Sequence, residues 1–524
     1  MEGCALGRAV IRGGSRRAEP GPDPRQRSLA AAAAIRAVHV DMKGVPPTFK
    51  RLLRLLKIFR HAGFNAVLME WEDAFPWSID TGFRNETAFS PAQVCQFHER
   101  AKQLGLAVLP LVQCLGHMET PLRLEKYRHL RERPEETDVL NVLAPGARDL
   151  VWGMIDDVLA LTPECRFFFL GGDEAWSFGQ HADTRAYIRR HGKPALYLQH
   201  VAPLCERLRS RGIRPVLWHD MMVGWSGANL RALASRADLC VWAYHRPAEI
   251  PWSMPIPPKA VGSELPVLAG GGGVVWSDTL ARFQKHGLRL WGAGAYKCST
   301  PGWNSDLPDF ASRVRNFQDW LAFGRRFGLQ GIVATGWSRN STQNVQYVPV
   351  DAALDTLIAC GRLWSEAGIR QWRREDSLRT LAAIGELGLY ERVVGLMGKL
   401  TRIRENGWSV VVRLRELLAL AGVDPRRREA ALAQRHLCWL KDYSDAGEML
   451  RLEAQDIFRN LVEWVWIERY FGERLGALHA EYADLQRHIL RCRDLPVRKK
   501  ALKIVPATPP RNGRIRFDVR ARER

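Results

Sequence analysis

The sequence predicts an α/β fold, a (β/α)8 TIM barrel followed by an all-α C-terminal appendage. Short apolar runs alternate with amphipathic helical patterns from residue 35 to about residue 365. The runs are rich in β-branched and aromatic residues and apolar almost throughout, which is typical of parallel strands buried on both faces. Eight such units over about 330 residues also match the size of a TIM barrel.

The individual elements follow from these patterns in chain order. The expected strands are residues 35–41, 65–70, 106–111, 166–171, 214–218, 239–243, 288–293 and 331–336. Helices expected between them include residues 47–62, 91–104, 148–161, 196–211, 309–327 and 351–360. Several of these begin with Pro or an acidic residue, as helix N-termini do. A doubly wound sheet is the alternative fold, but no GxGxxG turn follows the first strand.

The chain is expected to contain four parts. The catalytic barrel would span residues 35–368, and a helical C-terminal domain, with Leu, Trp and Val at three- and four-residue spacing, residues 369–495. That domain would pack on the barrel or on a second subunit, so a homodimer through it is a candidate assembly. Residues 1–34 and 496–524 are basic and are expected to be disordered. The leader lacks the apolar core of a signal peptide, although an organelle transit peptide would also be rich in Arg and poor in acids.

The charge and the cysteines narrow the function classes. The net charge of +21 fits either a polyanion-binding surface or Arg spread throughout the chain. We favour the second interpretation, and expect no nucleic-acid partner, because no basic run lies in a known binding motif. No apolar stretch reaches the ~18 residues of a membrane span. The 10 cysteines are scattered singly without metal-ligand spacing, so buried free thiols and a cytoplasmic location are expected.

Polar and aromatic residues follow nearly every expected strand. In a TIM barrel the active site lies at the C-terminal ends of the strands. The residues at those ends are Asp41, Glu70, Glu72, Asp73, Gln113, His117, Glu119, Asp173, Glu174, Trp218, His219, Asp220, Trp242, Tyr244, Tyr296, Lys297 and Trp337. Tryptophan faces stack on sugar rings, and carboxylates accept hydrogen bonds from hydroxyls. The pattern therefore predicts a sugar-binding site.

The strongest single signal is residues 167–174, FFFLGGDE. Strong strand formers end in two glycines, which let the backbone turn sharply and approach a ligand, and two adjacent acids follow. An isolated Asp-Glu pair is usually a solvated turn. The position at the end of the apolar fourth strand instead favours a catalytic role for Asp173 and Glu174.

The GGDE segment resembles the catalytic signature of glycoside hydrolase family 20, the β-N-acetylhexosaminidases, and other segments resemble its hexosaminidase D branch. These segments are residues 38–44 (VHVDMKG), 69–76 (MEWEDAFP), 110–119 (PLVQCLGHME), 218–222 (WHDMM) and 335–339 (TGWSR). The resemblance covers roughly residues 35–365 and arrives in barrel order. It implies a retaining enzyme that removes terminal β-linked GlcNAc or GalNAc from a glycan, with no metal or organic cofactor.

The resemblance also implies substrate-assisted catalysis, in which the 2-acetamido oxygen of the substrate attacks the anomeric carbon. Glu174 would protonate the leaving oxygen and later deprotonate water. Asp173 would hold the acetamido N–H. Because these two roles need different protonation states, we expect Glu174 to be the more shielded from water of the two.

The remaining candidates have weaker support. Asp41 either binds a sugar hydroxyl or caps the next loop, and His117 either steadies the site or packs structurally. Asp220 either contacts a hydroxyl or orients another acid. The expected aromatic walls are Trp218, Trp242, Tyr244, Tyr296 and Trp337. Tyr244 and Tyr296 compete for the hydrogen bond to the acetamido oxygen, and His219 stands where close relatives are expected to carry an acid.

Two rival functions are a catalytically silent sugar-binding barrel and a basic, polyanion-binding scaffold that uses both tails. The first need not keep Asp173, Glu174 and Trp337 together, so their joint presence argues against it. Strong salt dependence of polyanion binding would favour the second. The sequence does not separate GlcNAc from GalNAc preference, or exo from endo action.

Overall fold

The computed structural model describes residues 34–162, 164–245, 276–297, 306–339, 348–365, 371–421 and 428–491. Its centre is a closed, all-parallel barrel whose strands follow chain order from β1 to β8. The strands are β1 (Ile35–Asp41), β2 (Ala66–Glu70), β3 (Ala107–Leu111), β4 (Phe167–Phe169), β5 (Arg214–Trp218), β6 (Asp238–Trp242), β7 (Leu290–Lys297) and β8 (Gly331–Gly336). The pairing of β1 with β8 closes the ring. The predicted TIM barrel is thus confirmed.

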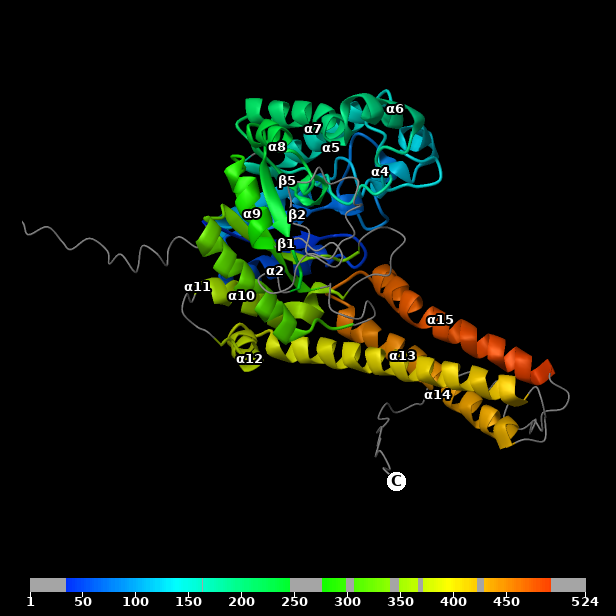
Figure 1. The fold of residues 1–524 in the computed structure, drawn as a ribbon. Helices are drawn as coiled ribbons and strands as arrows, with labels where there is room; N and C mark the ends of the chain where they lie inside the picture. The colour runs from blue at the N-terminus through cyan, green and yellow to red at the C-terminus, as the bar shows by residue number, and fades with distance from the viewer. Residues whose placement is uncertain are drawn as a thin grey trace, which may run out of the picture. The chain divides into compact units, whose positions relative to one another are not determined.

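Helices cover the outside of this barrel, and Figure 1 shows α5, α7 and α8 on one side of the strands and α2, α10 and α11 on the other. The helices up to α11 are α2 (Phe49–Ala62), α3 (Pro91–Gln103), α4 (Glu119–Leu122), α5 (Ala147–Leu161), α6 (Ala182–His191), α7 (Lys193–Ser210), α8 (Gly227–Ala234), α9 (Trp276–Lys285), α10 (Phe310–Phe327) and α11 (Leu354–Ser365). Helix α3 begins with a capping box between Ser90 and Gln93, with Pro91 in its first turn. That start agrees with the one that the Pro signal predicts.

The barrel interior is filled with apolar side chains from alternate positions of the strands, as the pleat requires. The cluster contains Ala37, Ala66, Leu68, Leu109, Leu111, Phe169, Val216, Trp218, Cys240, Trp291, Ala293 and Val333. Outside the barrel, Gly292 and Gly294 of β7 lie against the Trp320 ring, where an added Cβ would approach it to 2.4 and 2.9 Å. The two glycines therefore let α10 pack closely on β7.

Four strands differ in length from the prediction: β2 and β3 each begin one residue later than expected, and β4 and β7 differ by more. Strand β4 is shorter, because Gly171 and Gly172 adopt positive φ angles of 62° and 80° and leave the ladder. Strand β7 runs on to Lys297, with a register shift against β8 between Ala295 and Lys297. Both changes occur at the end of the barrel where the candidate residues lie.

The chain divides into two compact units, with a boundary later than the expected one at residue 368. The first unit runs to Met397 and also includes Ile457–Tyr470. It therefore takes in α12 (Arg374–Ala383) and the first part of α13 (Leu387–Ala421). Buried ion pairs join this part of the chain to the barrel helices: Arg51 of α2 contacts Asp351 at 2.6 Å and Glu386, between α12 and α13, at 2.9 Å.

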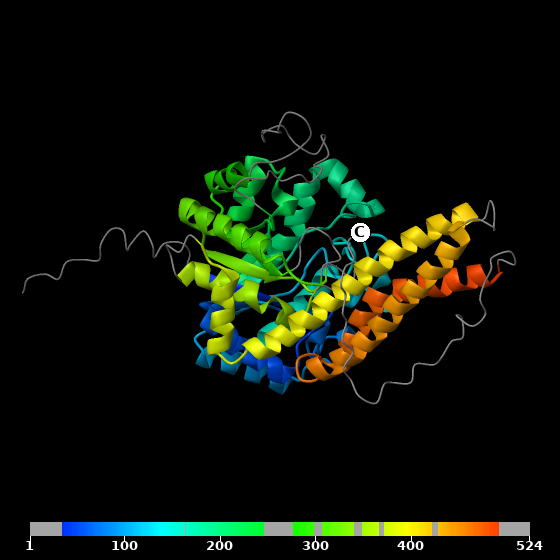
Figure 2. The same cartoon turned by 90° about the horizontal axis from the view of Figure 1, so that it is seen from below.

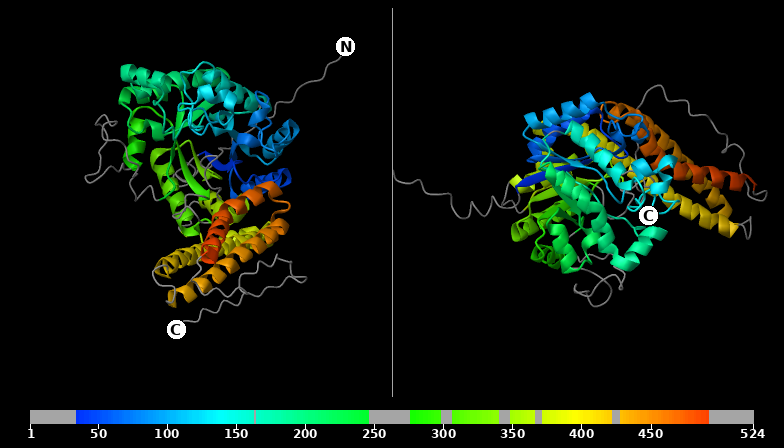
Figure 3. Two further views of the ribbon diagram at one scale, coloured as in Figure 1. Left: turned by 90° about the vertical axis from the view of Figure 1, so that its right-hand side faces the viewer. Right: turned by 90° about the horizontal axis from the view of Figure 1, so that it is seen from above.

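The second unit contains the rest of α13, α14 (Arg428–Phe458) without its last residues, and the later part of α15 (Trp464–Arg491). Figure 2 and the left view of Figure 3 show these long helices, in yellow, orange and red, lying alongside one another. Their shared core contains Val411, Leu414, Leu417, Leu418, Ala433, Leu437, Leu440, Leu478, Leu485 and Ile489. A helical C-terminal region is therefore confirmed, while the homodimer through it stays a prediction.

The expected leader, residues 1–34, lies outside the described residues except for its last one, and the expected tail, residues 496–524, lies outside them altogether. Within the described part of the chain, every helix is too short or too polar to cross a membrane. The described cysteines carry free thiols. Cys114, Cys205, Cys240 and Cys360 are buried as expected, whereas Cys95 and Cys438 are exposed.

Candidate active site

The turn after β4 is built for close packing. Positive φ angles at Gly171 and Gly172 would strain any other residue. There is also no room for a side chain, because an added Cβ would lie 1.8 Å from the Gln113 side chain at Gly171 and 2.5 Å from the Tyr197 hydroxyl at Gly172. The Tyr197 hydroxyl donates a hydrogen bond to the Gly172 carbonyl at 3.0 Å. These contacts fix the conformation of the turn that precedes Asp173 and Glu174.

The two acids differ in burial in the opposite sense to the prediction. The Asp173 side chain is 7% exposed, whereas the Glu174 side chain is 28% exposed. Glu174 has a positive φ of 45°, so the backbone turns at this residue as it leaves the barrel end. The expectation that Glu174 is the better shielded acid is therefore wrong for the protein without substrate. Burial raises the pKa of Asp173 to about 6, against the lowering effect of His117.

His117 lies beside both acids. Its Nε2 atom is 3.4 Å from Glu174 Oε2 and 3.7 Å from Asp173 Oδ2. Although burial lowers the pKa of His117, the charge of Asp173 and a hydrogen bond to Glu174 outweigh it and raise the pKa to about 10. The side chain is therefore an imidazolium at neutral pH, between two carboxyl groups.

Asp220 contacts Glu174 from the end of β5. Its Oδ2 atom accepts a hydrogen bond of 2.9 Å from the backbone N–H of Glu174. Burial and the nearby charge of Asp173 raise the pKa of Asp220 to about 8. Of the two roles left open by the sequence, this contact favours the orientation of another acid.

Three of the predicted aromatic residues come together at the ends of β6 and β8. The rings of Trp242 and Tyr244 are stacked, with centroids 5.3 Å apart and planes 13° apart. Trp337 Nε1 donates a hydrogen bond of 2.9 Å to the Tyr244 hydroxyl. All three side chains are half-buried, so part of each ring is open to solvent. The group forms an aromatic wall, defined as Trp242, Tyr244 and Trp337.

The other two predicted aromatic residues, Trp218 and Tyr296, are more deeply buried than the aromatic wall. Trp218 has no exposed surface, belongs to the barrel core and packs beneath the Trp337 ring at 5.9 Å. Tyr296 is also fully buried, and its hydroxyl lies 3.4 Å from the His39 carbonyl oxygen. Of the two competing tyrosines, only Tyr244 therefore presents surface that a ligand could touch.

Asp41 forms hydrogen bonds at the place where β1 and β8 close the barrel. Its Oδ1 accepts from the Lys43 N–H at 2.9 Å, and its Oδ2 accepts from the Ser338 N–H at 2.8 Å. The Ser338 hydroxyl returns a hydrogen bond of 2.9 Å to the Asp41 carbonyl. These contacts connect the end of β1 with the chain after β8, next to Trp337, and favour the loop-capping role over a sugar contact.

A buried ionic network lies beside the site, and it joins the strand-end acids Glu70 and Glu72 to Lys43 and His39, which were not among the strand-end candidates. Lys43 Nζ is 3.2 Å from Glu70 and 3.5 Å from Glu72, and His39 Nε2 is 3.1 Å from Glu70. Burial raises the pKa of Glu72 to about 8. Glu72 is one of the acids that follow the second expected strand, but nothing local in the sequence distinguishes it from Glu70 or Asp73.

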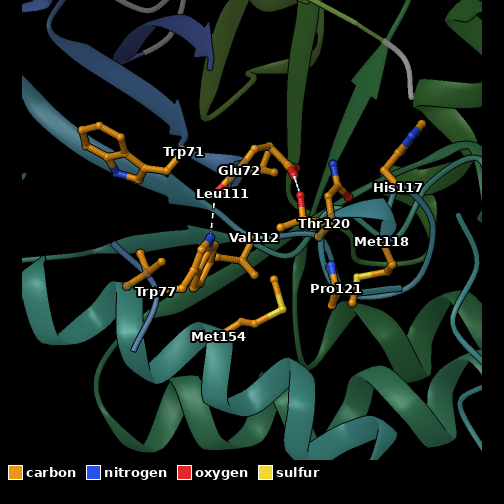
Figure 4. A pocket seen from close by; sticks show the side chains of 12 residues that line it. Trp71, Glu72, Trp77, Leu111, Val112, His117, Met118, Thr120, Pro121 and Met154 are labelled. Carbon is orange, nitrogen blue, oxygen red and sulfur yellow. Dashed lines mark hydrogen bonds between the residues drawn. The ribbon is translucent and has the colours of Figure 1, made fainter. Parts of the chain in front are cut away.

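Figure 4 shows Glu72 and His117 lining one pocket, with Thr120 donating a hydrogen bond of 2.7 Å to Glu72 and Trp77 one of 2.8 Å to its carbonyl. The non-glycine residues with positive φ in the described chain are Glu72, His117 and Glu174. Such backbone costs energy and clusters at functional sites. Two of these strained residues, His117 and Glu174, are in contact with each other.

His219, which stands where close relatives are expected to carry an acid, packs against two tryptophan rings. His219 is fully buried, with its ring 5.5 Å from Trp242 and 5.5 Å from Trp276. Burial lowers the pKa of His219 to about 3, so the ring is neutral. It supports the aromatic wall from behind. A run of four glycines, residues 270–273, follows the sixth expected strand and lies outside the described residues.

Among the residues that the structure describes, no group of three or more His, Cys, Asp or Glu side chains is arranged to hold a metal ion. The site consists of carboxyl, imidazole, phenol and indole groups, which can transfer protons, bind hydroxyl and amide groups and stack on sugar rings.

No family model matches the chain. It is 30% identical over 340 residues to hexosaminidase D of Bos taurus, covering 62% of this chain and 90% of the bovine protein. It is 28% identical over 345 residues to hexosaminidase D of Homo sapiens, covering 64% of this chain and 66% of the human protein. Among solved structures, β-N-acetylhexosaminidase from Bacteroides fragilis has a TM-score of 0.49 at 14% identity, covering 68% of this chain and 70% of that one.

Proposed function

Because the chain belongs to the hexosaminidase D family of glycoside hydrolases, we propose that it is a retaining β-N-acetylhexosaminidase whose catalysis is assisted by the 2-acetamido group of the substrate. The substrate would be a glycan that ends in β-linked GlcNAc or GalNAc. One observation carries the proposal: Asp173 and Glu174 stand side by side at the end of β4, with His117 within 3.7 Å of both. The polyanion-binding scaffold gains no comparable support.

Glu174 suits the role of general acid and base. In the first step the acetamido oxygen bonds to the anomeric carbon while the bond to the leaving oxygen breaks, and Glu174 gives that oxygen a proton. In the second step the Glu174 carboxylate takes a proton from water. The water oxygen bonds to the anomeric carbon, the acetamido group is restored, and the product is the β anomer. The partial exposure of Glu174 supports this role, because leaving group and water must both reach it.

Asp173 suits the role of acetamido partner. Its carboxylate would accept a hydrogen bond from the acetamido N–H and stabilise the positive charge that develops on that nitrogen. It is nearly buried, so the interaction would be weakly screened by water. The neighbouring imidazolium of His117 favours the ionised form that this role requires.

The aromatic wall suits the acetamido group itself. The methyl of that group would pack on the indole faces of Trp242 and Trp337, while the Tyr244 hydroxyl would donate to the acetamido oxygen. A sugar with a free hydroxyl at carbon 2 would leave this wall empty.

The proposed mechanism is tested with a series of 4-nitrophenyl 2-acetamido-β-glycosides. The methyl carbon of their acetamido group carries no, one, two or three fluorine atoms. Each fluorine weakens the acetamido oxygen as a nucleophile, so kcat/KM should fall stepwise along the series. Proton NMR should show the β anomer first. Equal rates for all four substrates, or an α product, would contradict substrate assistance.

A further inference from the structure

Trp176 is an unusually exposed aromatic residue close to the catalytic acid. Its side chain is 62% exposed, and among the described residues of the barrel unit the other exposed large apolar side chain is Ile79, at 37%. Ile79 packs closely over Gly153 of α5, where an added Cβ would approach it to 2.2 Å. Trp176 lies two residues beyond Glu174, and its N–H donates a hydrogen bond of 2.8 Å to the Glu174 carbonyl. The backbone thus folds back at the acid and keeps Trp176 near it.

The loop that carries Trp176 is held in place on both sides. Ala175, Ser177 and Phe178, its neighbours, are buried. The Phe178 N–H donates to the Ala175 carbonyl at 3.2 Å, so a tight turn encloses Trp176. The indole is therefore exposed on a fixed segment.

A buried carboxylate fixes the following part of the same loop. Glu132 is 1% exposed, and its Oε1 atom accepts hydrogen bonds from the N–H groups of Gly179 at 2.8 Å and His181 at 2.9 Å. It also accepts one from the Thr184 hydroxyl at 2.5 Å. An exposed indole on a loop with this much internal bonding loses little freedom when a ligand packs on it, which favours binding.

We propose that Trp176 is the platform on which the leaving-group sugar stacks, so that the enzyme prefers N-acetylhexosamine linked to a second sugar ring. The inference rests on the proposed function of Glu174, because the atom that Glu174 protonates is the one that joins the two rings. The leaving ring must therefore lie close to Glu174, and Trp176 is the exposed apolar surface on its sequence-adjacent loop. The C–H face of a pyranose packs on an indole face as other apolar surfaces do.

Binding in the Glu174→Gln protein separates this inference from the reaction itself. Calorimetry compares N,N′-diacetylchitobiose and its GalNAc-terminated analogue with the two free monosaccharides, in Glu174→Gln and in Glu174→Gln/Trp176→Ala. The disaccharide that binds should bind about tenfold more weakly without Trp176, and the monosaccharide should change less than twofold. Trp176→Phe is the matched control and should keep most of the affinity.

Hydrolysis in the wild-type background gives the second readout. Trp176→Ala should lower kcat/KM about tenfold for the disaccharide, and less than twofold for the methyl β-glycoside, which has no second ring. Equal losses on both substrates, unchanged values on both, or unchanged disaccharide binding would overturn the platform. A wild-type protein that hydrolyses neither substrate would refute the proposed function, while the binding comparison would still decide the role of Trp176.

Discussion

The imidazole of His117 lies 3.4 Å from the carboxylate of Glu174, measured from Nε2 to Oε2, and 3.7 Å from Asp173. One cation thus faces two adjacent acids. The pKa of His117 is raised to about 10, because Asp173 and Glu174 stabilise the charged ring more than burial destabilises it. Its charge stabilises the folded protein fully below pH 6.5, and that stabilisation is lost as the pH rises through about 10.

His117→Asn should move the acidic limb of the pH–rate profile. In the wild type kcat/KM should fall as the pH drops through about 6, where Asp173 takes up a proton. Without the imidazolium the pKa of Asp173 rises further, so the limb should move up by roughly one unit or more. Asparagine tolerates the positive φ of 55° at this position. His61→Asn, at the exposed end of α2, is the control, and a limb that stays in place in His117→Asn would contradict the electrostatic role.

Removing the hydroxyl of Tyr244 should lower activity, whereas removing the hydroxyl of Tyr296 should lower stability. Tyr244→Phe removes the hydroxyl at the aromatic wall and should lower kcat/KM by about tenfold or more, as the loss of a transition-state hydrogen-bond donor does, with little change in stability. Tyr296→Phe removes a buried hydroxyl and should cost about 1 kcal/mol of folding free energy, with nearly unchanged kcat/KM. Steady-state kinetics and denaturant unfolding on both variants check this, and the reverse pattern would assign the acetamido contact to Tyr296.

Asp220→Asn should stabilise the protein increasingly as the pH rises. The pKa of Asp220 is raised from 3.8 to about 8, so between these values the unfolded chain releases a proton that the folded protein retains. Ionisation therefore costs the wild type stability over that window, and the variant avoids the cost. The stability difference should grow from pH 4 to about pH 8 and then level off. A difference that is constant with pH would contradict the raised pKa.

Most of the barrel could be predicted because each strand is apolar on both faces and bounded by polar residues. Strands β1, β5 and β8 have the bounds that the pattern predicts. Strand β4 is shorter, because the two glycines of the turn before Asp173 also end the ladder. The ion pairs of Arg51 could not be predicted, because they join residues about 300 positions apart and leave no local signal.

The proximity of Asp173 and Glu174 could be predicted because the two residues are adjacent in the sequence. Contacts across the barrel could not: the hydrogen bond from Trp337 to Tyr244 joins residues 93 positions apart, and the one from Ser338 to Asp41 joins residues 297 apart. The relative burial of the acids was also missed, because it follows from the turn at Glu174 and not from residue type. The polar residues that follow the strands indicate which side chains are candidates for a site. The role of each one depends on contacts and burial that only the folded structure shows.

The most direct test is the release of 4-nitrophenol from β-GlcNAc, β-GalNAc and plain β-glucoside substrates by the wild type and by Glu174→Gln. The account predicts hydrolysis of the N-acetyl sugars alone, and a loss of about 100-fold or more in the variant, as expected for a lost general acid. Equal activity on the glucoside would contradict the need for the acetamido group. A folded wild-type protein that releases nothing from any of the three would favour the catalytically silent sugar-binding barrel.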